Sequence, residues 1–83
     1  MKSSRRMLVP IALVREGEVV RIAGLTGGMG VRRKMIDLGL APGVIVNVVR
    51  NSFYGGPLIL EYGGTKLAIG RGLAGKILAE VEA

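Results

Sequence analysis

Apolar residues occupy every second position in five short segments of this 83-residue chain. A period of two is typical of a β-strand that buries one face, because successive side chains point to opposite sides of the strand. Turn-forming residues separate the segments, and Gly63-Gly64 forms one two-residue turn. The sequence therefore predicts a mainly β protein whose strands are, in chain order, 19–23, 44–49, 58–62, 67–69 and 77–81.

Residues 31–38 follow a helical period instead. Val31, Met35 and Leu38 stand at positions i, i+4 and i+7, so they share one face of a helix. The residues between them are mostly charged, which makes the shared stripe the face toward the core. We expect a short amphipathic α-helix in the long connection after the first strand.

The residues after this helix carry an explicit stop signal. Gly39 stands where a helix C-cap favours a left-handed residue, and Leu40 is placed to fold back onto Met35. Pro42-Gly43 supplies the backbone angles of a type II turn. The helix is therefore expected to end at this point, with a strand beginning directly after the turn.

Five strands and one helix-bearing connection close most easily into a small SH3-like barrel, which removes the edges of the sheet. Leu8 to Val14 is expected to be an extended entry segment at an edge, since Pro10 has no backbone N–H. Residues 1–8 are predicted to be a flexible basic tail, and residues 9–83 the barrel domain. Glycines at 70, 72 and 75 limit residues 71–75 to a single helical turn.

The net charge of +6 is concentrated in two clusters, namely Lys2, Arg5 and Arg6 in the tail and residues 32–34 on the helix. Nucleic-acid binding normally needs a continuous basic stripe, and aromatic residues make up only 4% of the chain, so no nucleic-acid partner is expected. The apolar run at 8–14 is too short for a membrane span and lacks a signal-peptide cleavage site. We therefore expect neither membrane insertion nor secretion.

The chain contains no cysteine and no histidine. It therefore lacks the usual general bases and nucleophiles, and its six carboxylates show no spacing typical of metal ligands, so we predict no catalytic residue and no metal site. The loop 24–30 is rich in glycine but does not have the spacing of a phosphate-binding loop. The sequence therefore favours a non-enzymatic protein over an enzyme.

Two segments, the outer face of the helix and the tip of a hairpin, are candidates for contact with a partner. Arg32, Arg33 and Ile36 project away from the buried stripe of the helix, and Phe53 and Tyr54 stand at the tip of a hairpin. The ordinary explanation is a solvated helix face, on which Arg33 pairs with Asp37, together with aromatic residues that cap the core. The functional hypothesis is that the helix and the hairpin tip form one partner-binding surface.

The residues from 35 to 43, MIDLGLAPG, resemble the signature of the FeoA domain. The resemblance extends to IAL at 11–13, GPL at 56–58 and LAI at 67–69, and it covers about residues 9 to 82. It implies a small cytoplasmic protein of prokaryotic ferrous iron uptake that accompanies a FeoB-type membrane GTPase transporter. It also implies, at most, weak binding of ferrous iron or another transition metal, with no other cofactor.

Two alternative functions remain open at this stage. FeoA-like domains also occur at the C-terminus of metal-dependent transcriptional regulators, so the chain could serve as a detached regulatory module of a metal-responsive repressor. A small basic barrel could also bind nucleic acid. The sequence does not determine the oligomeric state or the direction of any regulatory effect.

Overall fold

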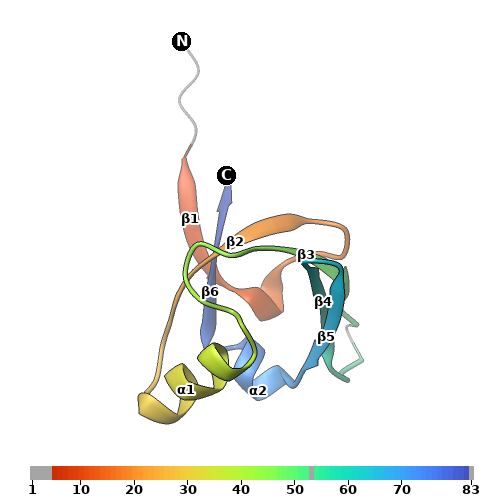
Figure 1. The fold of residues 1–83 in the computed structure, drawn as a ribbon. Helices are drawn as coiled ribbons and strands as arrows, with labels where there is room; N and C mark the ends of the chain where they lie inside the picture. The colour runs from red at the N-terminus through yellow and green to blue at the C-terminus, as the bar shows by residue number, and fades with distance from the viewer. Residues whose placement is uncertain (1–4, 53, 83) are drawn as a thin grey trace.

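The computed structural model describes residues 5–52 and 54–82 and contains one antiparallel sheet of six strands (Figure 1). Residues 1–4 of the predicted basic tail and the candidate Phe53 lie outside the described residues. The strands lie side by side in the order β1-β6-β2-β3-β4-β5. Their bounds are β1 Arg6–Pro10, β2 Val19–Leu25, β3 Ile45–Arg50, β4 Leu58–Tyr62, β5 Thr65–Ile69 and β6 Ile77–Glu82.

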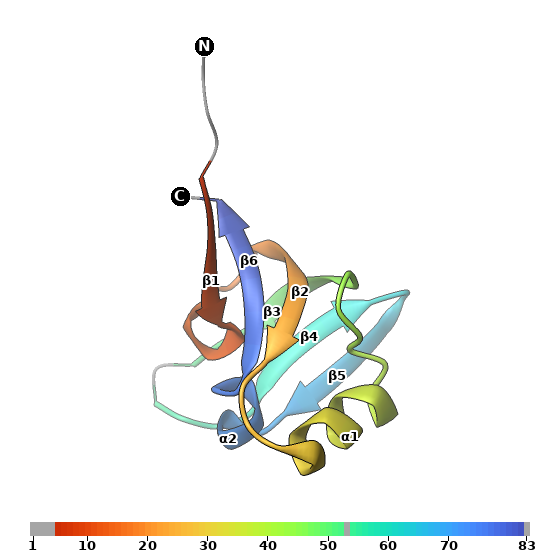
Figure 2. The same ribbon diagram turned by 90° about the vertical axis from the view of Figure 1, so that its left-hand side faces the viewer.

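Three short helices complete the fold: a 3₁₀ turn η1 (Ile11–Leu13), the helix α1 (Met29–Asp37) and the single turn α2 (Arg71–Ala74). The helix α1 lies in the connection between β2 and β3, and α2 lies between β5 and β6. Figure 2 shows the curved sheet from the side, with the two α-helices at its lower end. The predicted helix and the predicted single turn are therefore both confirmed.

The core lies inside the curved sheet and is formed by alternate residues of its strands together with residues of the helices and loops. Fourteen hydrophobic residues are buried, and among the described residues no polar or charged residue is buried with them. The alternation predicted for the central strands is confirmed by the buried pairs Val20 and Ile22, Val46 and Val48, and Leu58 and Leu60. These residues lie on the inner face because a side-chain period of two places them all on one side of the sheet.

The mainly β, SH3-like fold is confirmed, but the sheet has six strands where five were predicted, and it is open where a closed barrel was expected. The additional strand is β1, which pairs with β6 from Arg6–Glu82 to Pro10–Leu78. In the described part of the chain, β1 and β5 are each paired on one side only. The sheet thus begins at Arg6, inside the segment predicted to be a tail. Pro10 lies on an edge strand, as its missing N–H favours, but the extended segment predicted for Leu8 to Val14 stops there, because Ile11–Leu13 form the 3₁₀ turn η1.

Candidate functional site

The position of α1 is fixed first by the way the helix ends. Gly39 has φ +77°, and its N–H donates to the carbonyl of Ile36 at 3.0 Å. The N–H of Leu40 donates to the carbonyl of Met35 at 2.8 Å, which completes a Schellman motif. Leu40 and Met35 are both buried in the core cluster, as the predicted packing across the cap requires.

The neighbouring strands hold the same end of the helix. The hydroxyl of Tyr62 on β4 donates to the carbonyl of Leu38. The turn at Pro42-Gly43 is confirmed, since the N–H of Val44 donates to the carbonyl of Ala41 at 3.1 Å and Gly43 has φ +97°. The N–H of Gly43 donates to the carbonyl of Ile22 on β2 at 2.7 Å. The C-terminal end of α1 is thus anchored to both β2 and β4.

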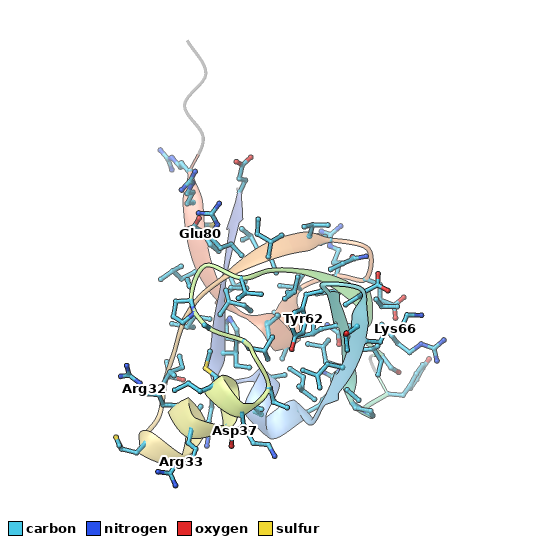
Figure 3. The ribbon with its side chains drawn as sticks, in the orientation of Figure 1. Arg32, Arg33, Asp37, Tyr62, Lys66 and Glu80 are labelled. Carbon is cyan, nitrogen blue, oxygen red and sulfur yellow. The ribbon has the colours of Figure 1, made fainter. Side chains whose placement is uncertain are left out.

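This anchoring determines which side of α1 faces solvent. Met35 points into the core and Val31 and Leu38 pack against it, so the predicted buried stripe is confirmed. Arg32 and Arg33 are exposed and point away from the body of the protein (Figure 3), and Ile36 is 62% exposed. The ion pair predicted between Arg33 and Asp37 is absent from the described part of the chain. Among the described residues, the one salt bridge within 4.0 Å joins Arg6 and Glu80.

A groove of about 400 Å³ runs beside Ile36, between α1 and the end of β2. Arg32 is the only charged residue among its described lining residues, which are Gly24, Leu25, Arg32, Met35, Ile36, Leu40, Ala41 and Pro42. We call Arg32, Arg33, Ile36 and this groove the α1 face. It combines an apolar depression with two arginines that no neighbouring carboxylate of the described chain neutralises within 4.0 Å.

The hairpin between β3 and β4 lies on a different side of the molecule from α1 (Figures 1 and 2). Tyr54 in this hairpin is fully exposed. The pocket that Tyr54 lines shares no residue with the groove of the α1 face. The structure therefore brings Arg32, Arg33 and Ile36 together and places Tyr54 elsewhere, so the helix and the hairpin do not form the single surface that was expected.

A polar network around Asn51 was not predicted from the sequence. Its side-chain amide donates to the carbonyls of Ala12 at 2.8 Å and Val14 at 2.7 Å, and its own N–H donates to Oε1 of Glu16 at 2.8 Å. A guanidinium nitrogen of Arg71 on α2 donates to Oδ1 of Asn51 at 2.5 Å. Its partners lie 20 to 39 residues away along the chain, so nothing in the local sequence distinguishes this asparagine from an ordinary turn residue.

The acidic residues are dispersed over the structure. In residues 5–52 and 54–82, no group of three or more histidine, cysteine, aspartate or glutamate side chains is placed to hold a metal ion. In the same residues, no helix combines the length and the apolar character needed to cross a membrane. What the described surface offers is a set of exposed cationic and apolar side chains, which can bind another molecule by contact and charge.

Comparison with known proteins gives consistent results. The FeoA domain family model matches residues 9–81. A protein of Methanocaldococcus jannaschii, provisionally named Fe(2+) transport protein A, is 37% identical over 73 residues, which cover 88% of this chain and 87% of that protein. The crystal structure of an iron uptake regulatory protein, FeoA, is 33% identical with a TM-score of 0.79 and covers 90% of this chain and 99% of its own.

Two further solved structures extend the comparison. A FeoA-like protein from Clostridium acetobutylicum is 26% identical with a TM-score of 0.78, over 98% of this chain and 90% of that one. A manganese-dependent transcriptional repressor aligns with a TM-score of 0.80 over 92% of this chain and 42% of its own, but at 14% identity this likeness shows the fold alone. Because the family model spans nearly all of the described sheet, the chain belongs to the FeoA domain family.

Proposed function

We propose that this protein is a non-enzymatic accessory and regulatory protein of prokaryotic ferrous iron uptake, acting in the cytoplasm on a FeoB-type membrane GTPase transporter. Membership of the FeoA domain family supports the link to iron uptake. So do the names of two relatives, one called an Fe(2+) transport protein and the other an iron uptake regulatory protein. The proposed contact with the transporter is through the α1 face.

The α1 face carries this proposal because it has the composition of a protein-binding surface. Ile36 exposes 62% of its surface beside an apolar groove, and Arg32 and Arg33 flank it. Arginine is enriched in protein interfaces, and a few residues near the desolvated centre of a contact contribute most of its free energy. An acidic partner surface with one protruding apolar side chain would complement both features.

The anchoring of the C-terminal end of α1 supports the same proposal. The helix ends in a Schellman motif, and Tyr62 and the turn at Pro42-Gly43 hold that end against two strands. A binding surface that is already ordered loses little conformational entropy on association. The α1 face is therefore suited to bind a partner without first rearranging.

We also propose that the protein affects iron movement without itself binding iron tightly. Ferrous iron is bound best by several convergent nitrogen, oxygen or sulfur ligands, and the chain has no histidine or cysteine to contribute. No other cofactor is required for a function that depends on contact. The transported iron is then the cargo of the partner.

Two pairs of variants test the contact with the purified cytoplasmic domain of the transporter from the same organism. Arg32→Gln with Arg33→Gln removes two positive charges from the α1 face, and Arg21→Gln with Lys66→Gln removes two from exposed strand positions. We expect the first pair to weaken binding by about tenfold or more, which corresponds to about 1.4 kcal/mol. The second pair should leave the Kd unchanged apart from a small long-range charge effect.

A second comparison tests the apolar part of the α1 face. Ile36→Ala removes the side chain beside the groove, and Ile45→Ala removes one that is 54% exposed on β3. Only Ile36→Ala should weaken the complex. Equal Kd values for the α1 variants and their matched controls would contradict the proposal, provided that circular dichroism shows all four proteins folded.

A further inference from the structure

A larger pocket, of about 800 Å³, shares none of its described lining residues with the α1 face. Three segments that are distant in sequence form it: the end of η1 with the loop that follows, the end of β3 with the hairpin, and the start of α2. Each of them contributes an arginine, namely Arg15, Arg50 and Arg71. We call this pocket, with the residues that line it, the arginine pocket.

The arginine pocket carries an excess of positive charge. Glu16 is the only acidic residue among its described lining residues, and one of its carboxylate oxygens already accepts the N–H of Asn51. In the described residues, none of the three arginines has a carboxylate within 4.0 Å. Like charges that are brought together repel one another, so an anionic ligand would be stabilised here.

One of the three guanidinium groups is held in a fixed position. The amide of Asn51 donates to two backbone carbonyls, which turns its oxygen toward Arg71. Arg71 donates to this oxygen and to the carbonyl of Ser52. Both bonds use the same guanidinium nitrogen. Because the described residues give the other N–H groups of Arg71 no partner, these groups can bind a carboxylate, which arginine binds in a planar, two-bond geometry.

Two large apolar side chains accompany these charges. Leu13 is 73% exposed and Tyr54 is fully exposed, and both line the arginine pocket. Tyrosine and arginine are, with tryptophan, the residues most enriched at the energetic centres of protein interfaces. A nucleic acid would instead need a basic stripe with several stacking aromatic residues, whereas the arginine pocket is a compact cluster with a single described tyrosine.

We propose that the arginine pocket binds an acidic peptide segment of a partner protein, with carboxylates on Arg15, Arg50 and Arg71 and one apolar side chain against Leu13 and Tyr54. This inference goes beyond the proposed function, because none of these residues belongs to the α1 face. The protein then has two separate binding surfaces and can connect two acidic elements, either on one partner or on two.

The test uses isotope-labelled protein and an acetylated, amidated peptide of sequence Asp-Glu-Leu-Glu-Asp. We expect saturable changes in the amide NMR signals of residues 12–16, 50–52 and 71. Arg15→Gln with Arg50→Gln should weaken this binding by about tenfold or more. Arg32→Gln with Arg33→Gln, the matched loss of two charges on the α1 face, should leave it unchanged. Arg71 is kept in every variant because it also connects α2 to the hairpin.

Three results would overturn the inference: no saturation at millimolar peptide, signal changes centred on α1, or equal weakening by both pairs of variants. A single-stranded oligonucleotide that saturates the same signals where the peptide does not would also overturn it, in favour of a nucleic-acid site. A peptide with serine in place of leucine should bind more weakly, and unchanged binding would refute the apolar contact. Because Arg15→Gln with Arg50→Gln leaves the α1 face intact and the peptide titration needs no transporter, the proposed function can fail or succeed independently.

Discussion

Gly39 is a position at which the structure predicts a defined loss of stability on substitution. Its φ of +77° lies in the left-handed region, and a Cβ placed on it would lie 3.2 Å from the hydroxyl oxygen of Tyr62. Gly39→Ala therefore meets two separate costs: an unfavourable backbone angle and a displaced tyrosine. The chain offers a control for the first cost alone, because Gly43 has φ +97° and a Cβ there would contact nothing within 4 Å.

The magnitudes follow from these two costs. A left-handed backbone angle costs a non-glycine residue about 1–2 kcal/mol. The lower entropy of the unfolded chain after a glycine-to-alanine change offsets about 0.4–1 kcal/mol of this at both positions. Displacing Tyr62 weakens its hydrogen bond to Leu38, a loss of about 1 kcal/mol. We expect Gly43→Ala to destabilise the fold by about 1 kcal/mol and Gly39→Ala by about 2 kcal/mol.

Urea denaturation measures this difference, since a domain of this size is expected to unfold in a single transition. In thermal unfolding, the additional 1 kcal/mol lowers the Tm of Gly39→Ala by about 4–8 °C relative to Gly43→Ala. In a Tyr62→Phe background the hydroxyl is absent, so the two alanine variants should become equally stable. If Gly39→Ala costs no more than Gly43→Ala, or if Tyr62→Phe does not remove the difference, the reasoning about this close approach is refuted.

Two further predictions concern the polar network and iron. Asn51→Asp replaces a donating amide by an oxygen that faces two backbone carbonyls. It should lower the free energy of unfolding, measured by urea denaturation, by about 2–3 kcal/mol. A change below about 0.5 kcal/mol, the size of an ordinary surface substitution, would show that the network does not stabilise the fold. Anaerobic calorimetric titration with ferrous iron should give no saturable heat at micromolar protein, because the chain lacks histidine and cysteine; a sub-micromolar Kd would contradict this.

The features predicted correctly from the sequence are those that depend on neighbouring residues. The end of α1 could be predicted because Gly39 and Pro42-Gly43 fix the backbone whatever surrounds them. The buried faces of the strands could be predicted because side chains in a strand alternate strictly. The outward face of α1, with Arg32 and Arg33, follows from the same local geometry once its buried stripe is known.

The features that the sequence did not reveal depend on contacts between distant segments. The strand β1 pairs with β6, about 70 residues later, so the local sequence predicted an extended edge segment from Leu8 but neither its start at Arg6 nor its partner. The same holds for Asn51 and for the arginine pocket, whose parts meet only in the folded chain. The expected joint surface of α1 and the hairpin also required a tertiary arrangement, which the fold does not provide.

We propose that the protein acts by contact through the α1 face. NMR titration of the isotope-labelled protein with the purified cytoplasmic domain of the transporter tests it most directly. We predict that the largest signal changes or losses fall on residues 32–42, including Ile36 and the residues lining its groove. A titration that leaves these signals unchanged while the transporter domain is folded and in excess would contradict the claim.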